Sequence, residues 1–176
     1  MPLNLVLETG PSPRPLLEHA LAFVEEYYRK GHEGKTVVIG CDPEGKSTAF
    51  AAGLSRIEQQ KQLAVMARYL FLKHNVKRYL VVMPAWLGEE GEHEVVAIEV
   101  RTPAGRWRLT ADVLRDAEGR FHALKPGVAE PSDTPLLDHL LIHGQSLPGL
   151  MRRELDLAYR ALRIATPPEL CASPTP

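Results

Sequence analysis

Apolar side chains recur every three or four positions in several stretches of this chain, a spacing typical of amphipathic helices. The clearest stretch covers residues 56–74, where the apolar stripe contains Leu63, Met66, Ala67, Leu70, Phe71 and His74. Asn75 follows it directly and suits the left-handed conformation that often ends a helix. Two further helices are predicted, from Ser12 to about Lys30 and from Ser146 to about Ile164, and another between Pro131 and Gly144.

An alternating pattern predicts a β-hairpin in which residues 94–101 and 106–115 flank a turn at Thr102–Gly105. Pairing about this turn places only apolar residues on one face: Val100 opposite Trp107, Ile98 opposite Leu109 and Val96 opposite Ala111. The other face carries Glu99 opposite Arg108, Ala97 opposite Thr110 and Val95 opposite Asp112. One buried and one solvated face is typical of an antiparallel pair.

The remaining strands define the fold class. Residues Arg78–Met83 are apolar on both faces, which predicts a central strand, and Pro84 marks its end or an irregularity. Residues 120–124 form a further strand. Because strands follow one another after residue 77 without intervening helices, we expect an α+β fold. Its sheet is mixed, largely antiparallel, and packed with N-terminal, central and C-terminal helices. Residues 1–165 are predicted to form a single domain, and residues 166–176 a proline-rich mobile tail.

Residues 40–47 spell Gly-Cys-Asp-Pro-Glu-Gly-Lys-Ser, which matches the phosphate-loop pattern of nucleotide-binding proteins. In that interpretation Gly40 and Gly45 shape the loop, while Lys46 and Ser47 hold a Mg-nucleotide. A phosphate loop leads directly into a helix. Here the best helix start is a capping box at Ser55–Glu58, about ten residues too late.

The same residues also fit a type I turn, with Asp42 first, Pro43 second and Gly45 fourth. Folding about that turn pairs Val37 with Phe50 and Ile39 with Thr48. These local signals favour a hairpin, and nucleotide binding is retained as an alternative.

The composition places the chain among ordinary globular proteins. It has 176 residues, of which 44% are hydrophobic and 24% charged, with a net charge of −1. This balance argues against a nucleic-acid binder that relies on a large basic surface, and no segment is apolar enough to predict a membrane span. Cys41 and Cys171 are too few to predict a disulfide framework, and we interpret Cys41 as structural. A reducing cytoplasm is the expected location.

Three other groups of residues are candidates for chemistry. His139 and His143 are four residues apart on a predicted helix, a spacing that can bind a metal. An acidic loop with Glu89, Glu90 and Glu92 follows Trp86 and could contact a basic partner. A basic hairpin edge, which could hold an oligonucleotide, contains Arg101, Arg106 and Arg108 beside Trp107.

The predicted register of this hairpin places Trp107 on its apolar, inward face, and Glu99 can neutralise the charge of Arg108. Nucleic acid is therefore not the favoured partner. The sequence therefore favours a small, non-enzymatic protein-binding or regulatory domain that needs no cofactor. Its partner is another protein or a second copy in a homodimer formed by open sheet edges. The alternatives are a nucleotide binder that uses residues 40–47 and a metal-dependent hydrolase or nuclease.

Overall fold

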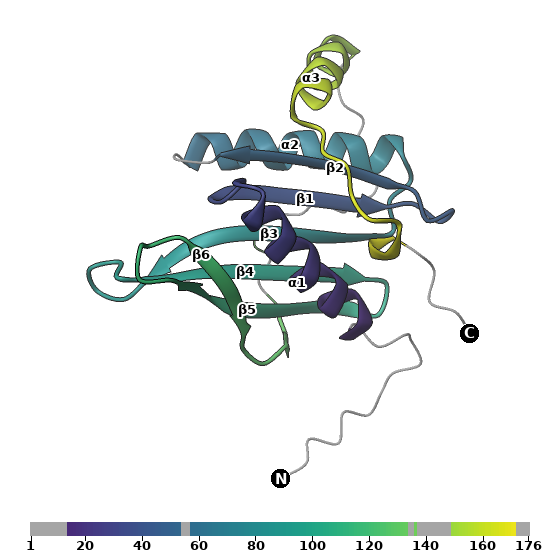
Figure 1. The fold of residues 1–176 in the computed structure, drawn as a ribbon. Helices are drawn as coiled ribbons and strands as arrows, with labels where there is room; N and C mark the ends of the chain where they lie inside the picture. The colour runs from purple at the N-terminus through teal and green to yellow at the C-terminus, as the bar shows by residue number, and fades with distance from the viewer. Residues whose placement is uncertain (1–13, 54–56, 134–135, 137–148, 172–176) are drawn as a thin grey trace.

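The computed structural model describes residues 14–53, 57–133, 136 and 149–171 of the chain. Its elements are α1 (Arg14–Arg29), β1 (Lys35–Cys41), β2 (Ser47–Gly53), α2 (Ile57–Lys73), β3 (Arg78–Leu87), β4 (His93–Thr102), β5 (Gly105–Arg115), β6 (Phe121–Pro126), β7 (Glu130–Pro131), α3 (Gly149–Leu162) and the 3-10 helix η1 (Pro168–Leu170). Figure 1 shows their arrangement. None of the described helices is long and apolar enough to cross a bilayer.

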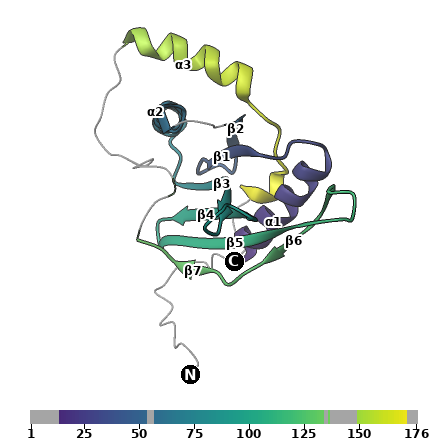
Figure 2. The same cartoon turned by 90° about the vertical axis from the view of Figure 1, so that its left-hand side faces the viewer.

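The strands form one antiparallel sheet with the order β2-β1-β3-β4-β5-β6, and β7 pairs with β5. Helix α1 packs on one face of this sheet and helices α2 and α3 on the other (Figure 2). The α+β class with a largely antiparallel sheet is therefore confirmed. So is the central helix, predicted over residues 56–74, and Asn75 after it has the expected positive φ of 53°.

Each face of the sheet has its own apolar core because successive strand residues point to opposite faces. The core under α1 contains Val37, Ile39, Leu80, Val96, Ile98 and Val100. The core under α2 and α3 contains Val38, Phe50, Tyr79, Val81, Leu70 and Phe71. The strands β1 and β3 are buried on both faces, which explains their nearly continuous apolar sequences.

The β4–β5 hairpin has the predicted register at every pair named above, including Val100 with Trp107 and Glu99 with Arg108. Its second face differs from the prediction, because Glu99 is fully buried rather than solvated. Pairs alone define which residues share a face, whereas burial also depends on what covers that face. Here Leu136, which packs with the α2 core, donates its backbone N–H to the Glu99 carboxylate.

The β1–β2 hairpin confirms the predicted turn, but the predicted register is wrong by one residue. Val37 pairs with Ala51 and Ile39 with Ala49. The cause is Gly45, which follows the type I turn with a φ of 81° and adds one residue to the loop as a bulge. Phe50 consequently points to the α2 face and not toward α1.

Strand β3 continues beyond Pro84, where the sequence predicted either its end or an irregularity. Its pairing with β1 stops at Val82, whereas its pairing with β4 extends to Leu87. Pro84 therefore lies where β3 is paired on one side only, the usual situation of proline in a sheet. The end of the β3–β4 hairpin consequently extends past the end of β1.

Residues 166–171, the first part of the segment predicted to be a mobile tail, pack against the fold, and residues 172–176 lie outside the described residues. Residues 163–171, which we call the C-terminal strap, cross the β2 edge of the sheet and pass from α3 to the α1 face (Figure 1). Leu170 is buried, and Cys171 forms a disulfide with Cys41 at a Cα–Cα distance of 5.2 Å. The strap is thus an ordered part of the fold. The predicted helix between Pro131 and Gly144 falls almost entirely outside the described residues, and Pro131 itself belongs to β7.

Candidate functional site

The residues of the phosphate-loop pattern have packing roles in the β1–β2 hairpin. Gly40 lies under α2, and a methyl group at this position would come within 2.6 Å of a ring carbon of Phe71. Gly45 provides the positive φ that the bulge requires. The backbone N–H of Lys46 donates to Oδ1 of Asp42 at 2.8 Å and closes the turn.

Ser47 begins strand β2, and its hydroxyl lies 2.6 Å from the hydroxyl of Thr166 on the strap. A phosphate loop instead places its Lys and Ser at the N-terminus of a helix, where backbone N–H groups converge on the anion. In this chain the loop leads into strand β2 instead of a helix, and nucleotide binding by Gly40, Gly45, Lys46 and Ser47 stays a prediction. The pattern arises from a turn sequence followed by a strand.

The end of the β3–β4 hairpin presents apolar side chains beside carboxylates. Trp86 is 62% exposed and Leu87 is 48% exposed. The loop that follows contains Glu89, Glu90 and Glu92, all exposed, and the backbone N–H of Glu90 donates to Glu92. The structure therefore brings together Trp86 and the three glutamates that the sequence analysis grouped as a partner-binding surface.

A cluster of ion pairs lies beside this hairpin end. Arg115 of β5 contacts Glu94 of β4 at 2.8 Å and Glu33, which precedes β1, at 2.7 Å. Both carboxylates stabilise the guanidinium and raise the pKa of Arg115 further above its ordinary value. Arg115 thus links the segment between α1 and β1 to the hairpin.

The predicted basic edge is organised around the buried Glu99. Arg108 contacts its carboxylate at 3.3 Å and Arg106 at 3.6 Å, and the hydroxyl of Tyr79 donates to it at 3.4 Å. The two guanidinium groups are consequently partly neutralised and turned toward the protein. This arrangement favours a structural role, because a backbone-binding surface for nucleic acid needs cations directed outward.

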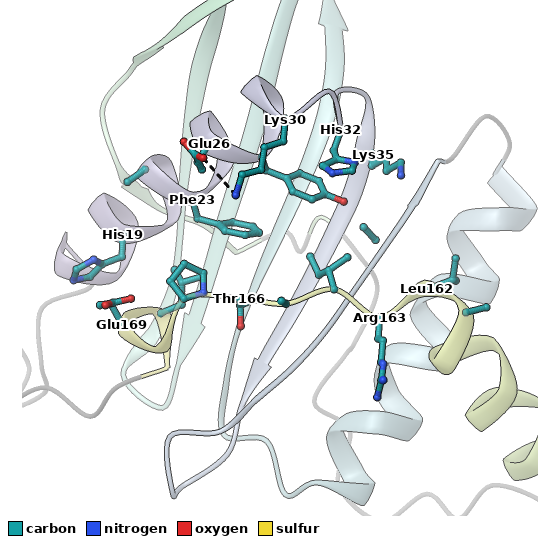
Figure 3. A pocket seen from close by; sticks show the side chains of 18 residues that line it. His19, Phe23, Glu26, Lys30, His32, Lys35, Leu162, Arg163, Thr166 and Glu169 are labelled. Atoms are coloured by element: carbon teal, nitrogen blue, oxygen red, sulfur yellow. Dashed lines mark ion pairs between the residues drawn. The ribbon is translucent and has the colours of Figure 1, made fainter.

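A groove of about 810 Å³ lies between α1 and the C-terminal strap, and Figure 3 shows the side chains that line it. We call it the α1–strap groove. The wall formed by α1 and the residues just after it contains nearly parallel stacked rings. The ring centroids of Phe23 and Tyr27 are 5.5 Å apart, and those of Tyr27 and His32 are 4.6 Å apart. Partial burial raises the pKa of the Tyr27 hydroxyl. Sequence reasoning missed this groove because one wall belongs to the segment predicted to be mobile.

The predicted metal ligands His139 and His143 lie outside the described residues. Among the residues that are described, no three His, Cys, Asp or Glu side chains lie together as a metal site requires. Comparison of the chain with protein-family models, with curated proteins and with solved structures finds no match. The functional argument therefore rests on the chain's own surfaces.

Proposed function

We propose that this protein is a non-enzymatic protein-binding domain whose contact surface is the end of the β3–β4 hairpin. The observation that carries the proposal is the 62% exposure of Trp86 at the end of a strand. Tryptophan is strongly enriched among the residues that dominate binding energy at protein interfaces. The exposed Trp86 provides the apolar centre that such an interface needs, whereas Leu87, the next residue of the strand, points to the opposite face of the hairpin.

The charges around this centre define the partner. Glu89, Glu90 and Glu92 follow Trp86 on the loop side and are exposed. Carboxylates at the rim of an interface favour a partner of opposite charge and mainly increase the rate of association. The partner is therefore a protein with an apolar pocket bordered by Lys or Arg.

Selection from a random peptide library on the immobilised full chain tests this proposal. Selected peptides should combine Lys or Arg with an aromatic or aliphatic residue, and their binding should shift the fluorescence of Trp86 to shorter wavelength in a Trp107→Phe background. Trp86→Ser should weaken binding by at least about tenfold, equivalent to about 1.4 kcal/mol. Val128→Ser, at an apolar residue that is 80% exposed elsewhere, is the matched control. Peptides that bind the Trp86→Ser variant equally well would show that this surface is not the site.

Sedimentation velocity at micromolar concentration determines whether the partner is a second copy of the chain. A dimer that is lost in Trp86→Ser would identify the homodimer, because both hairpin ends would then contribute to its interface. A monomer at all concentrations would leave another protein as the partner.

The disulfide bears on the cytoplasmic location, which we retain as part of the proposal. Reducing cytosols normally keep cysteines as thiols, so a cytoplasmic protein should contain Cys41 and Cys171 in reduced form. Alkylation of cells at the moment of lysis, followed by mass spectrometry, measures the state of both residues. Complete oxidation in the cell would contradict the cytoplasmic location.

A further inference from the structure

The α1–strap groove has the size and lining of a small-molecule site. Its volume of about 810 Å³ falls within the range of about 300–1,000 Å³ that is usual for such sites. The interior surface is mainly apolar, with contributions from Phe23, Tyr27, Ala51, Ile164 and Leu170. A few charged groups at the rim complete the combination that fixes the orientation of a bound ligand.

The strap wall of the groove is held in place by contacts at both ends. The backbone N–H of Ile164 donates to the carbonyl of Ala49 at 3.0 Å, next to the bridge between Arg163 and Phe50. At the other end the disulfide joins Cys171 to β1, and Arg78 donates to the carbonyl of Cys171 at 2.6 Å. A fixed wall lowers the conformational entropy lost on binding, which favours affinity.

The α1 wall indicates a ligand with a flat ring. The rings of Phe23, Tyr27 and His32 are inclined by only 21° and 24° and stack on one another, so their faces meet within the stack and its side presents ring edges. Aromatic groups also pair favourably edge to face, beyond the gain from burying their area. A flat ring lying in the groove can place one face against these edges and the other against the apolar strap.

The rim charges indicate that the ligand carries an anion. Lys30, His32 and Lys35 line the groove where α1 passes into β1, and Figure 3 shows the Lys30 amine directed toward the groove and the Lys35 side chain directed away from Lys30. Lys30 contacts Glu26 at 3.4 Å, but both side chains of this pair are more than half exposed, so the contact is weak and exchangeable. Arg163 points away from α1 and Glu169 lies at the opposite end beside His19 (Figure 3).

We propose that the α1–strap groove binds a small organic anion, a carboxylate or sulfonate attached to a flat apolar ring system. The ring contacts the edges of the Phe23–Tyr27–His32 stack, the anion pairs with Lys30, and the charge of Lys35 on the same rim adds to the attraction. This site is separate from the β3–β4 hairpin and does not depend on the protein-binding proposal. Trp86→Ser should consequently leave ligand binding in the groove unchanged.

The test uses 1-anilinonaphthalene-8-sulfonate and its uncharged analogue N-phenyl-1-naphthylamine as probes in fluorescence titrations of the oxidised full chain. The sulfonate probe should bind at one saturable site, at least about tenfold more tightly than the uncharged analogue. Lys30→Glu combined with Lys35→Glu should weaken sulfonate binding by at least about tenfold, since the contact with Lys30 and the attraction of the Lys35 charge both become repulsive. Lys61→Glu combined with Lys125→Glu, at two exposed lysines outside the groove, is the matched control.

A second variant tests the location without changing charge. Ala22 is an exposed α1 residue that lines the groove, so Ala22→Trp should fill it and abolish binding of both probes. Ala117→Trp, in the exposed turn between β5 and β6, should bind both probes as the parent does. Circular dichroism and melting of each variant verify folding. Absence of saturable binding, or equal affinity in the Ala22→Trp variant, would overturn the site. Binding that is blocked by Ala22→Trp but unaffected by charge reversal would overturn the anion preference.

Discussion

Opening the disulfide between Cys41 and Cys171 should remove a large part of the stability of this fold. The two residues are 130 positions apart, so the bond closes a loop that contains most of the described chain. It also fastens the strap to the end of β1. Reduction therefore both enlarges the unfolded ensemble and releases a segment that contains the buried Leu170.

The magnitude follows from the length of the closed loop. In the chain-entropy model the stabilisation rises with the logarithm of loop length, and a loop of 130 residues corresponds to about 5 kcal/mol. Measured losses for native disulfides are about 2–5 kcal/mol, so the model value is an upper limit. With a urea m-value of about 2 kcal/mol/M for a chain of this size, the midpoint should fall by about 1–2.5 M.

Urea unfolding of the parent chain with and without dithiothreitol, followed by circular dichroism, measures this difference. The Cys41→Ser, Cys171→Ser double variant is the control. Its urea midpoint should equal that of the reduced parent and should not change when dithiothreitol is added. Thiol titration of the unreduced, denatured parent should find no reactive thiol. Two reactive thiols per chain, or a midpoint that reductant shifts by less than about 0.3 M, would refute the reasoning.

Four further predictions concern the core, the sheet and the loop. Glu99→Gln should lower the free energy of unfolding by about 1–3 kcal/mol in chemical denaturation, because it leaves the half-buried guanidinium groups of Arg106 and Arg108 without their charge partner; Glu118→Gln, in an exposed pair, should cost at most about 1 kcal/mol. Gly40→Ala should cost about 1–3 kcal/mol by overpacking α2, whereas Gly53→Ala has open space and should be nearly neutral in the same assay. Burial raises the pKa of Tyr28 to about 12, so its native state keeps a proton that the unfolded state loses above a pKa of about 10. The stability that this proton contributes is fully present below pH 10, and the free energy of unfolding should fall as pH rises from about 10 to 12. Over the same pH range, the urea midpoint of a Tyr28→Phe variant should fall less steeply than that of the parent. Mg-ATP and Mg-GTP should leave the melting temperature unchanged, because β2 occupies the place where a phosphate-binding helix would begin. A nucleotide that did bind would add about 2.7 kcal/mol to the free energy of unfolding at a concentration a hundredfold above its dissociation constant.

Local patterns were sufficient to predict most elements of the sheet. The β4–β5 register followed from alternation and turn length, because a shift by one residue would have moved Ile98 and Val100 away from the core. The β1–β2 register was missed because a bulge at Gly45 changes the residue count without changing the turn signal. Both outcomes depend on local geometry, and the second needed knowledge of a single φ angle.

Long-range contacts account for what the sequence did not predict. The strap lacks a long apolar run, and its proline content is typical of mobile ends. Its order depends on Cys41, 130 residues away, and on the β2 edge, neither of which is visible in local composition. The same reasoning applies to Glu99, whose partner on β5 was predicted but whose burial depends on Leu136. The sequence did group the residues of the hairpin surface at Trp86, because Trp86 and the three glutamates are close neighbours along the chain.

The two proposed surfaces carry opposite charges and are joined by Arg115. This residue contacts Glu33, in the segment that also contains the groove cations, and Glu94 at the hairpin end. Carboxylates at the hairpin weaken the attraction of the groove for an anion only where they lie within a screening length of about 8 Å of it at physiological salt. A basic partner on the hairpin cancels part of such a repulsion. Any coupling between the two ligands is reciprocal, so each changes the affinity of the other by the same factor, and a dependence of that factor on salt would identify the coupling as electrostatic.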